Sequence, residues 1–119
     1  MKQKSLGALG ERLALKFLKN KGYRFIESNF RSTFGEIDLI FQDKKTLVLV
    51  EVKTRFSDFY GKPEEAITPR KINTIIKTGE YFSLINKFTG EMRVDVVAIM
   101  LNNNSLALKS LKHFQNITL

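Results

Sequence analysis

Two short segments of alternating side chains, separated by a tight polar turn, constrain the fold of this chain most strongly. Residues 36–42 read Glu-Ile-Asp-Leu-Ile-Phe-Gln, and residues 46–54 read Thr-Leu-Val-Leu-Val-Glu-Val-Lys-Thr. Period-two patterns of this kind predict β-strands, and the intervening Asp43-Lys44-Lys45 predicts a tight antiparallel connection. Apolar side chains occur on both faces of both segments, which predicts a sheet that is covered on both sides.

The register of this hairpin brings two carboxylates face to face. A two-residue turn at 44–45 pairs Asp43 with Thr46, and the same register places Asp38 directly opposite Glu51. Like charges at a Cβ separation of about 5 Å are destabilising unless a cation compensates them. Alternation predicts one face with Asp38, Ile40, Leu49, Glu51 and Lys53 and another with Ile37, Leu39, Phe41, Val48, Val50 and Val52.

This pair of carboxylates indicates a divalent cation. Oxygen ligands without Cys or His select Mg²⁺ or Mn²⁺, and the sequence has no Cys and one His. Lys53, on the same face, is placed to stabilise charge on a phosphate or to orient an attacking water. A second interpretation is an outer face that is merely charged, with Lys53 neutralising a carboxylate. Glu11, at the border of a helical apolar arc, points either into this site or out to solvent.

The remaining segments complete an α/β pattern. We expect a helix over 5–22 and a strand over 23–31, then a loop over 55–68 after the hairpin. Thr68-Pro69 predicts an N-cap and the start of a helix that runs to about Asn86. Residues 94–101 and 106–114 predict two more strands, the last at an edge. The order is α-β-β-β-α-β plus a terminal strand, in which a helical crossover requires a parallel pair within a mixed central sheet flanked by helices.

Composition limits the classes of function. The chain has 119 residues, 20 basic and 12 acidic, for a net charge of +8. This length predicts a single domain over 1–119. The absence of Cys excludes a disulfide scaffold, a Cys-ligated zinc site and thiol catalysis. With no signal-peptide or membrane-span pattern, we expect a cytoplasmic protein. The positive charge indicates a polyanionic partner, first nucleic acid and second an anionic membrane surface.

The carboxylate motif is similar to one known group of nucleases. Gly35-Glu36-Ile37-Asp38 followed by Glu51-Val52-Lys53 resembles the Asp…Glu-x-Lys core of the PD-(D/E)xK superfamily. Within it, the chain resembles the YraN-type family, which is related to archaeal Holliday-junction resolvases, over nearly its whole length. Ile37 stands where the superfamily's name has Pro. The resemblance implies a restriction-endonuclease-like core in which Asp38 and Glu51 are the main metal ligands. Glu11 would act through water or as an outer acid, and Lys53 would assist the water nucleophile.

Other residues are candidates for contacts with nucleic acid. Arg70 and Lys71 begin the second helix, where a helix N-terminus favours a phosphate, although a solvated turn is the alternative. Arg55 follows the core motif and could reach the same anion. Phe56, Phe59 and Tyr60 could stack on unpaired bases or fold their loop onto the body. Asp95 is expected to form a structural ion pair with Arg93, and His113 is expected to be solitary.

These observations lead to three hypotheses of function. The first is a Mg²⁺- or Mn²⁺-dependent endonuclease that hydrolyses phosphodiester bonds in DNA, including branched or structured DNA, with RNA as an open alternative. The second is a non-catalytic nucleic-acid-binding module on a nuclease fold. The third is a basic adaptor for a protein or an anionic membrane surface. The resolvase relatives imply a homodimer, whereas no residue of this chain requires one.

Overall fold

The computed structural model of the chain describes residues 3–57 and 61–117, and side chains from Leu6 onward. Its elements follow the expected order. They are α1 (Gln3–Asn20), β1 (Arg24–Arg31), β2 (Glu36–Asp43), β3 (Thr46–Phe56), the 3-10 helix η1 (Pro63–Ala66), α2 (Pro69–Ile85), β4 (Met92–Leu101) and β5 (Leu108–Phe114). The α-β-β-β-α-β order with a terminal strand is confirmed. The proposed stacking residues Phe59 and Tyr60 lie outside the described ranges.

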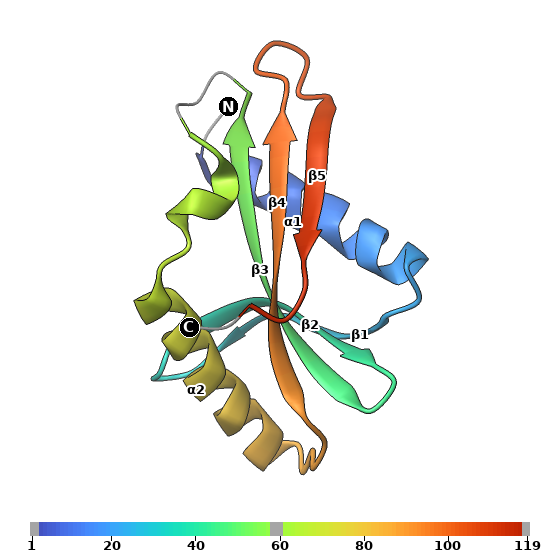
Figure 1. Ribbon diagram of the computed structural model, residues 1–119, viewed down its shortest axis with the longest axis vertical. Coiled ribbons are helices and arrows are strands. Elements are labelled where there is room, and N and C mark those ends of the chain that lie inside the picture. The colour runs from blue at the N-terminus through green and yellow to red at the C-terminus, as the bar shows by residue number, and fades with distance from the viewer. Residues whose placement is uncertain (1–2, 58–60, 118–119) are drawn as a thin grey trace.

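All five described strands form one mixed sheet in the order β1-β2-β3-β4-β5. β3 and β4 are parallel, as the helical crossover requires, and the other neighbours are antiparallel. In Figure 1, α1 passes behind the sheet and α2 lies on its nearer side, so each face has a helix. β5 is an edge strand, as predicted. No helix within residues 3–57 or 61–117 is long and apolar enough to cross a membrane.

Two apolar cores hold the helices to the sheet. The core beneath α1 contains Ala14, Leu18, Leu39, Phe41, Val48, Val50, Val97, Ile99 and Leu101. The core beneath α2 contains Ile37, Ile40, Leu47, Leu49, Ile72, Ile75, Phe82 and Val94. Helix α2 begins as its sequence predicts, because the Thr68 hydroxyl accepts the N–H of Lys71 at 3.1 Å. A Cβ at Gly79 would overlap Leu49, so glycine lets α2 lie directly on β3.

The hairpin has the predicted register but separates at the end distant from its turn. Backbone pairing runs from Asp43–Thr46 to Leu39–Val50. Beyond this point β2 stays with β1 and β3 stays with β4. Figure 1 shows β1 and β2 swinging away from the upright β3, β4 and β5. We call this opening between β2 and β3 the fork.

The fork corrects one prediction about the faces of β2. Alternation placed Ile37 on the face of Leu39, but Ile37 packs in the core beneath α2 and Leu39 in the core beneath α1, with Asp38 between them. The alternation changes phase because β2 turns away from β3 at this position. The side chain of Asp38 is thereby directed toward β3, where its Oδ2 accepts a hydrogen bond from the N–H of Val52.

Candidate metal and nucleic-acid site

A cavity of about 460 Å³ lies at the fork. Helix α1 contributes part of its wall, β2 contributes Asp38, and the last half of β3 contributes the rest. The lining consists of Leu6, Gly7, Glu11, Asp38 and residues 51–56. Four predicted site residues, Glu11, Asp38, Glu51 and Lys53, therefore share one cavity although they come from three elements.

Asp38 is fixed in this cavity by the backbone of β3. Its Oδ2 accepts a hydrogen bond from the Val52 N–H at 2.8 Å. Burial raises the pKa of Asp38 above its ordinary value, in spite of this hydrogen bond. A side-chain hydrogen bond with Glu51 lowers this pKa in the same direction as the Val52 N–H does. The sequence predicts the position of Asp38 opposite Glu51, and the structure holds it there by a side chain-to-backbone contact instead of a ladder pair.

Glu51 is the most constrained acid of the site. It is 6% exposed, and its Oε1 is buried without a hydrogen-bond partner among the described residues. Its Oε2 lies 3.9 Å from the Nζ of Lys71. Burial, followed by the negative charge of Asp38, raises the pKa of Glu51 to about 8. A buried carboxylate is unfavourable when one of its oxygens has no partner and a second carboxylate lies beside it, and a nearby cation would offset this cost.

A divalent cation fits these donors. Both acids offer hard oxygen atoms, and the unsatisfied Oε1 of Glu51 needs a cation or a donor. Within residues 3–57 and 61–117, no cluster of three or more His, Cys, Asp or Glu forms a closed ligand set. Mg²⁺ is commonly held by one or two carboxylates together with water and substrate phosphate. Asp38 and Glu51 would therefore hold the ion while leaving room for substrate.

Glu11 reaches the cavity from α1. A Cβ at Gly10 would overlap the hydroxyl of Thr54, so a glycine here brings the helix close against β3. The Glu11 Oε1 accepts a hydrogen bond from Asn29 Nδ2 at 3.2 Å. Burial raises the pKa of Glu11, and the charges of Asp38 and Glu36 add to the effect. Within the described residues Glu11 forms no three-acid cluster with the pair, and its outer role stays a prediction.

The candidate cations are distributed around the acids. Lys53 and Arg55 line the cavity, and the positive charges of Lys53 and Lys71 favour the ionised form of Glu51. An Arg55 Nη1 donates to the Thr54 carbonyl at 2.9 Å. Arg70 is exposed on the first turn of α2, outside the described lining of the cavity. The structure thus brings Lys53, Arg55 and Lys71 to the site and leaves Arg70 at its periphery.

Two features of the site could not be found from the sequence. Contact between Lys71 and Glu51 joins two elements that are distant in the chain, and no local pattern predicts such a contact. Asn29, the partner of Glu11, is the second feature. It lies at the left-handed φ of 52°, a conformation that Asn adopts more readily than most residues.

A second polar cluster lies outside the cavity lining and corrects the prediction for His113. Asp95 forms the predicted ion pair with Arg93, at 3.0 Å from its Nε. His113 is not solitary, because its Nε2 lies 2.8 Å from Asp95 Oδ2 and its Nδ1 lies 2.7 Å from Lys21 Nζ. Burial opposes ionisation of Asp95, but hydrogen bonds from His113, Arg93 and a backbone N–H keep its pKa below the ordinary value. This network joins the turn that follows α1 to β4 and β5.

The sequence is similar to one described family over most of its length. A family model described as "Uncharacterised protein family UPF0102" matches residues 10–99. The UPF0102 protein of Clostridium botulinum (strain Kyoto / Type A2) is 44% identical over 116 residues, covering 92% of this chain and 93% of that protein. The UPF0102 protein of Persephonella marina (strain DSM 14350 / EX-H1) is 45% identical over 105 residues, covering 87% of this chain and 90% of that protein. The matched region contains every candidate site residue.

Proposed function

We propose a function on the premise that this chain belongs to the UPF0102 (YraN) family, which is PD-(D/E)xK nuclease-like. The proposed function is that of a divalent-metal-dependent endonuclease that hydrolyses phosphodiester bonds in DNA, including branched or structured DNA. The observation that carries the proposal is the Oε1 of Glu51, buried without a partner beside Asp38. A fold that needs only stability would not leave two acids together in a cavity, because their repulsion and desolvation are unfavourable.

The chemistry divides among the residues of the cavity. Asp38 and Glu51 would hold Mg²⁺ or Mn²⁺, and the bound ion would supply Lewis-acid stabilisation of the phosphate and lower the pKa of a bound water. Lys53 stabilises negative charge that develops on the phosphate and orients the attacking water. Glu11 positions water at the edge of the site. Lys71 and Arg55 attract the DNA backbone, as does the net charge of +8.

The non-catalytic binding module is the competing function. The ion pair between Lys71 and Glu51, at 3.9 Å, is the observation in its favour, because a lysine can neutralise part of the acidic charge without a metal. A binding module would retain its affinity for DNA with the acids removed. The nuclease would lose cleavage and keep its affinity.

The test uses the purified protein with labelled single-stranded, duplex, flap and four-way-junction DNA, and single-stranded RNA for comparison. Reactions contain Mn²⁺ or EDTA, and a gel reports both shifted and cut DNA. We expect Mn²⁺-dependent cuts that are absent from Glu51→Gln and present in Glu91→Gln, a matched change at an exposed position. Shifts without cuts on every substrate, equal in both variants, would overturn the nuclease in favour of the binding module.

Two properties connected with this proposal need separate measurements. We propose the cytoplasm as the location, where the protein would meet DNA, and fractionation of cells with an antibody tests this. The homodimer implied by the resolvase resemblance is tested by light scattering on the full chain, with and without a four-way junction. Two cuts in one junction by a monomer would require two successive binding events.

A further inference from the structure

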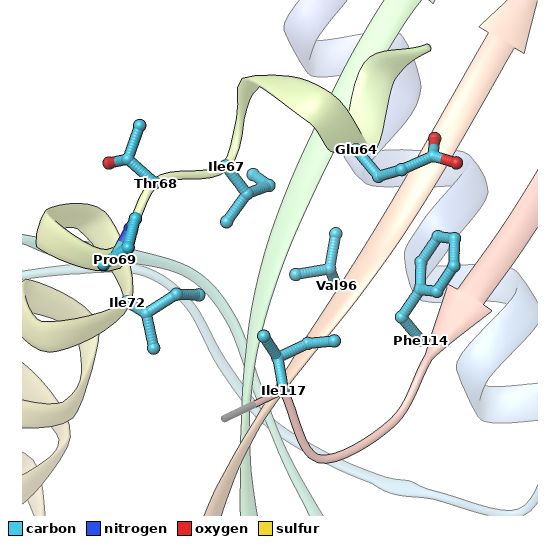
Figure 2. A pocket seen from close by; sticks show the side chains of 8 residues that line it. All are labelled: Glu64, Ile67, Thr68, Pro69, Ile72, Val96, Phe114 and Ile117. Atoms are coloured by element: carbon cyan, nitrogen blue, oxygen red, sulfur yellow. The ribbon is translucent and has the colours of Figure 1, made fainter. Parts of the chain in front are cut away.

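A second cavity, of about 310 Å³, lies between η1, the start of α2, β4 and the C-terminal end of the described chain. Figure 2 shows its lining residues around the opening. Six of them are apolar, namely Ile67, Pro69, Ile72, Val96, Phe114 and Ile117, and two are polar, Glu64 and Thr68. This composition, a largely apolar wall with a few polar groups, is typical of small-ligand pockets, at the small end of their range of roughly 300–1,000 Å³.

This pocket is next to the proposed catalytic acids. Val96, in its wall, is the register partner of Glu51 in the parallel β3–β4 ladder, so the two side chains project from the same face of adjacent strands, which are about 4.8 Å apart. Thr68 caps the helix whose Lys71 lies 3.9 Å from Glu51. When the phosphate of a nucleotide lies at Asp38 and Glu51, the base of that nucleotide or of the neighbouring nucleotide can therefore reach the pocket.

We propose that this pocket receives one unpaired base of the DNA substrate, next to the phosphate that is cut. The inference rests on the proposed nuclease function and adds that the substrate is DNA with an unpaired base. Phe114 offers an aromatic face for stacking, which is indifferent to base identity. The Glu64 carboxylate, which points toward the opening near Phe114 in Figure 2, accepts a hydrogen bond from an exocyclic amino group. Figure 2 shows the Thr68 hydroxyl directed away from the cavity, where its oxygen accepts the Lys71 N–H, so Glu64 is the polar group that faces a base.

The chemistry of the wall favours a base over other occupants. A phosphate or sugar would leave its oxygens unpaired against Ile67, Ile72 and Val96, which is unfavourable. A flat ring buries its faces on apolar side chains and keeps its polar edge at Glu64. Bases inside an intact duplex cannot enter such a pocket without leaving the stack. The protein should therefore prefer bulges, flaps and junctions, in which unpaired bases need little energy to be extruded.

The experiment compares two DNA duplexes that differ only in one base. Each carries a one-nucleotide bulge, which is a normal nucleotide in the first and an abasic site in the second. Affinity of the full chain is measured by fluorescence anisotropy in EDTA, so that no cleavage is required. We expect the bulged base to bind about 5- to 150-fold more tightly than the abasic bulge, the range that corresponds to stacking of one base. Equal affinities for the two duplexes would overturn the inference.

Variants connect the difference to this pocket. Phe114→Leu keeps apolar bulk but removes the aromatic face, and it should abolish most of the base-dependent difference. Phe34→Leu, the same change at an exposed ring outside the pocket, should leave it unchanged. Ile67→Trp, which fills the cavity, provides a second variant if Phe114→Leu unfolds at a lower temperature. A base-dependent difference that survives both pocket variants would contradict the assignment.

The design separates the two proposals. Mn²⁺-dependent cutting of both duplexes with equal affinities would support the nuclease and overturn the pocket. A base-dependent affinity that is lost in the pocket variants, without cleavage of any DNA, would overturn the nuclease and keep the pocket as a binding site of the module.

Discussion

The Oδ2 of Asp38 accepts a hydrogen bond from the backbone N–H of Val52 at 2.8 Å. The backbone ladder between β2 and β3 ends at Leu39, and this side-chain contact links the two strands one residue beyond that end. We expect Asp38→Ala to lower the free energy of unfolding by about 1–3 kcal/mol, since it leaves that N–H without a partner. Asp38→Asn keeps an oxygen acceptor, so it should retain most of the stability while Mn²⁺ binding is lost. Urea unfolding and calorimetric titration with Mn²⁺ measure the two effects. Equal destabilisation by both substitutions would show that the charge, rather than the hydrogen bond, is the stabilising element.

Stability of the metal-free protein should fall as the pH rises from about 4.5 to about 8. The ordinary pKa of Glu51 is 4.5, and burial, with the charge of Asp38, raises it to about 8 in the folded state. Between these values the folded state binds the proton more strongly than the unfolded state, so unfolding is favoured by higher pH. Thermal unfolding in EDTA across this range measures the slope, which Glu51→Gln should flatten and Glu91→Gln should not.

The same linkage predicts the effect of the metal. Adding Mg²⁺ at pH 8 should raise the unfolding temperature of the wild-type protein, because an ion that binds only the folded state stabilises it. Glu51→Gln should show little response. A steep pH dependence that persists in Glu51→Gln would assign it to other groups.

Lys71, whose Nζ lies 3.9 Å from Glu51 Oε2, is the residue that we propose to contact the DNA backbone beside the acids. Lys71→Gln should weaken binding of every DNA to a similar degree and reduce the slope of log affinity against log salt by about 1, as expected for one lost phosphate contact. Lys77→Gln removes an exposed lysine further along the same helix and serves as the control. Anisotropy titrations at several salt concentrations give both slopes. If the two variants have the same slope as the wild type, Lys71 serves only to neutralise Glu51.

Gly10 and Gly7 should respond in opposite directions to the same substitution. Alanine in a helix interior usually stabilises by about 0.5–1 kcal/mol relative to glycine, and a Cβ at Gly7 meets nothing within 4 Å. At Gly10 the added methyl would overlap Thr54, and overpacking of this kind costs about 1–3 kcal/mol. Gly10→Ala should therefore lower the unfolding temperature and displace Glu11. A stabilised Gly10→Ala protein would indicate that α1 is free to shift on β3.

Much of the architecture could be predicted from local patterns. The period-two segments and the polar turn predicted the hairpin and its register, and Thr68-Pro69 predicted the start of α2. The crossover between β3 and β4 predicted their parallel pairing. These features depend on residues that are close in the chain, or on connection rules that hold for any sheet. The proximity of Asp38 and Glu51 in one cavity was accessible for the same reason, although the backbone ladder ends at Leu39 and Val50 and the two acids are not ladder partners.

The errors arose where tertiary structure overrides alternation. Ile37 was placed on the wrong face because strict alternation assumes that β2 continues beside β3, whereas it turns away at Asp38. His113 was expected to be solitary because its partners, Asp95 and Lys21, come from other elements. The contact of Lys71 with Glu51 depends on how α2 lies on the sheet, which the sequence pattern of α2 alone does not determine.

At the fork, the stability of the sheet and the space for the acids make opposite demands on the sequence. Each backbone pair that β2 and β3 could add beyond Leu39 and Val50 would strengthen the sheet and close the space that the acids occupy. Substitutions that extend this ladder should therefore yield proteins that melt at higher temperature and lack the proposed activity on DNA. A search for thermostable variants would tend to select inactive ones at these positions, whereas the 44–45 turn, at the opposite end of the hairpin, can be altered without this conflict.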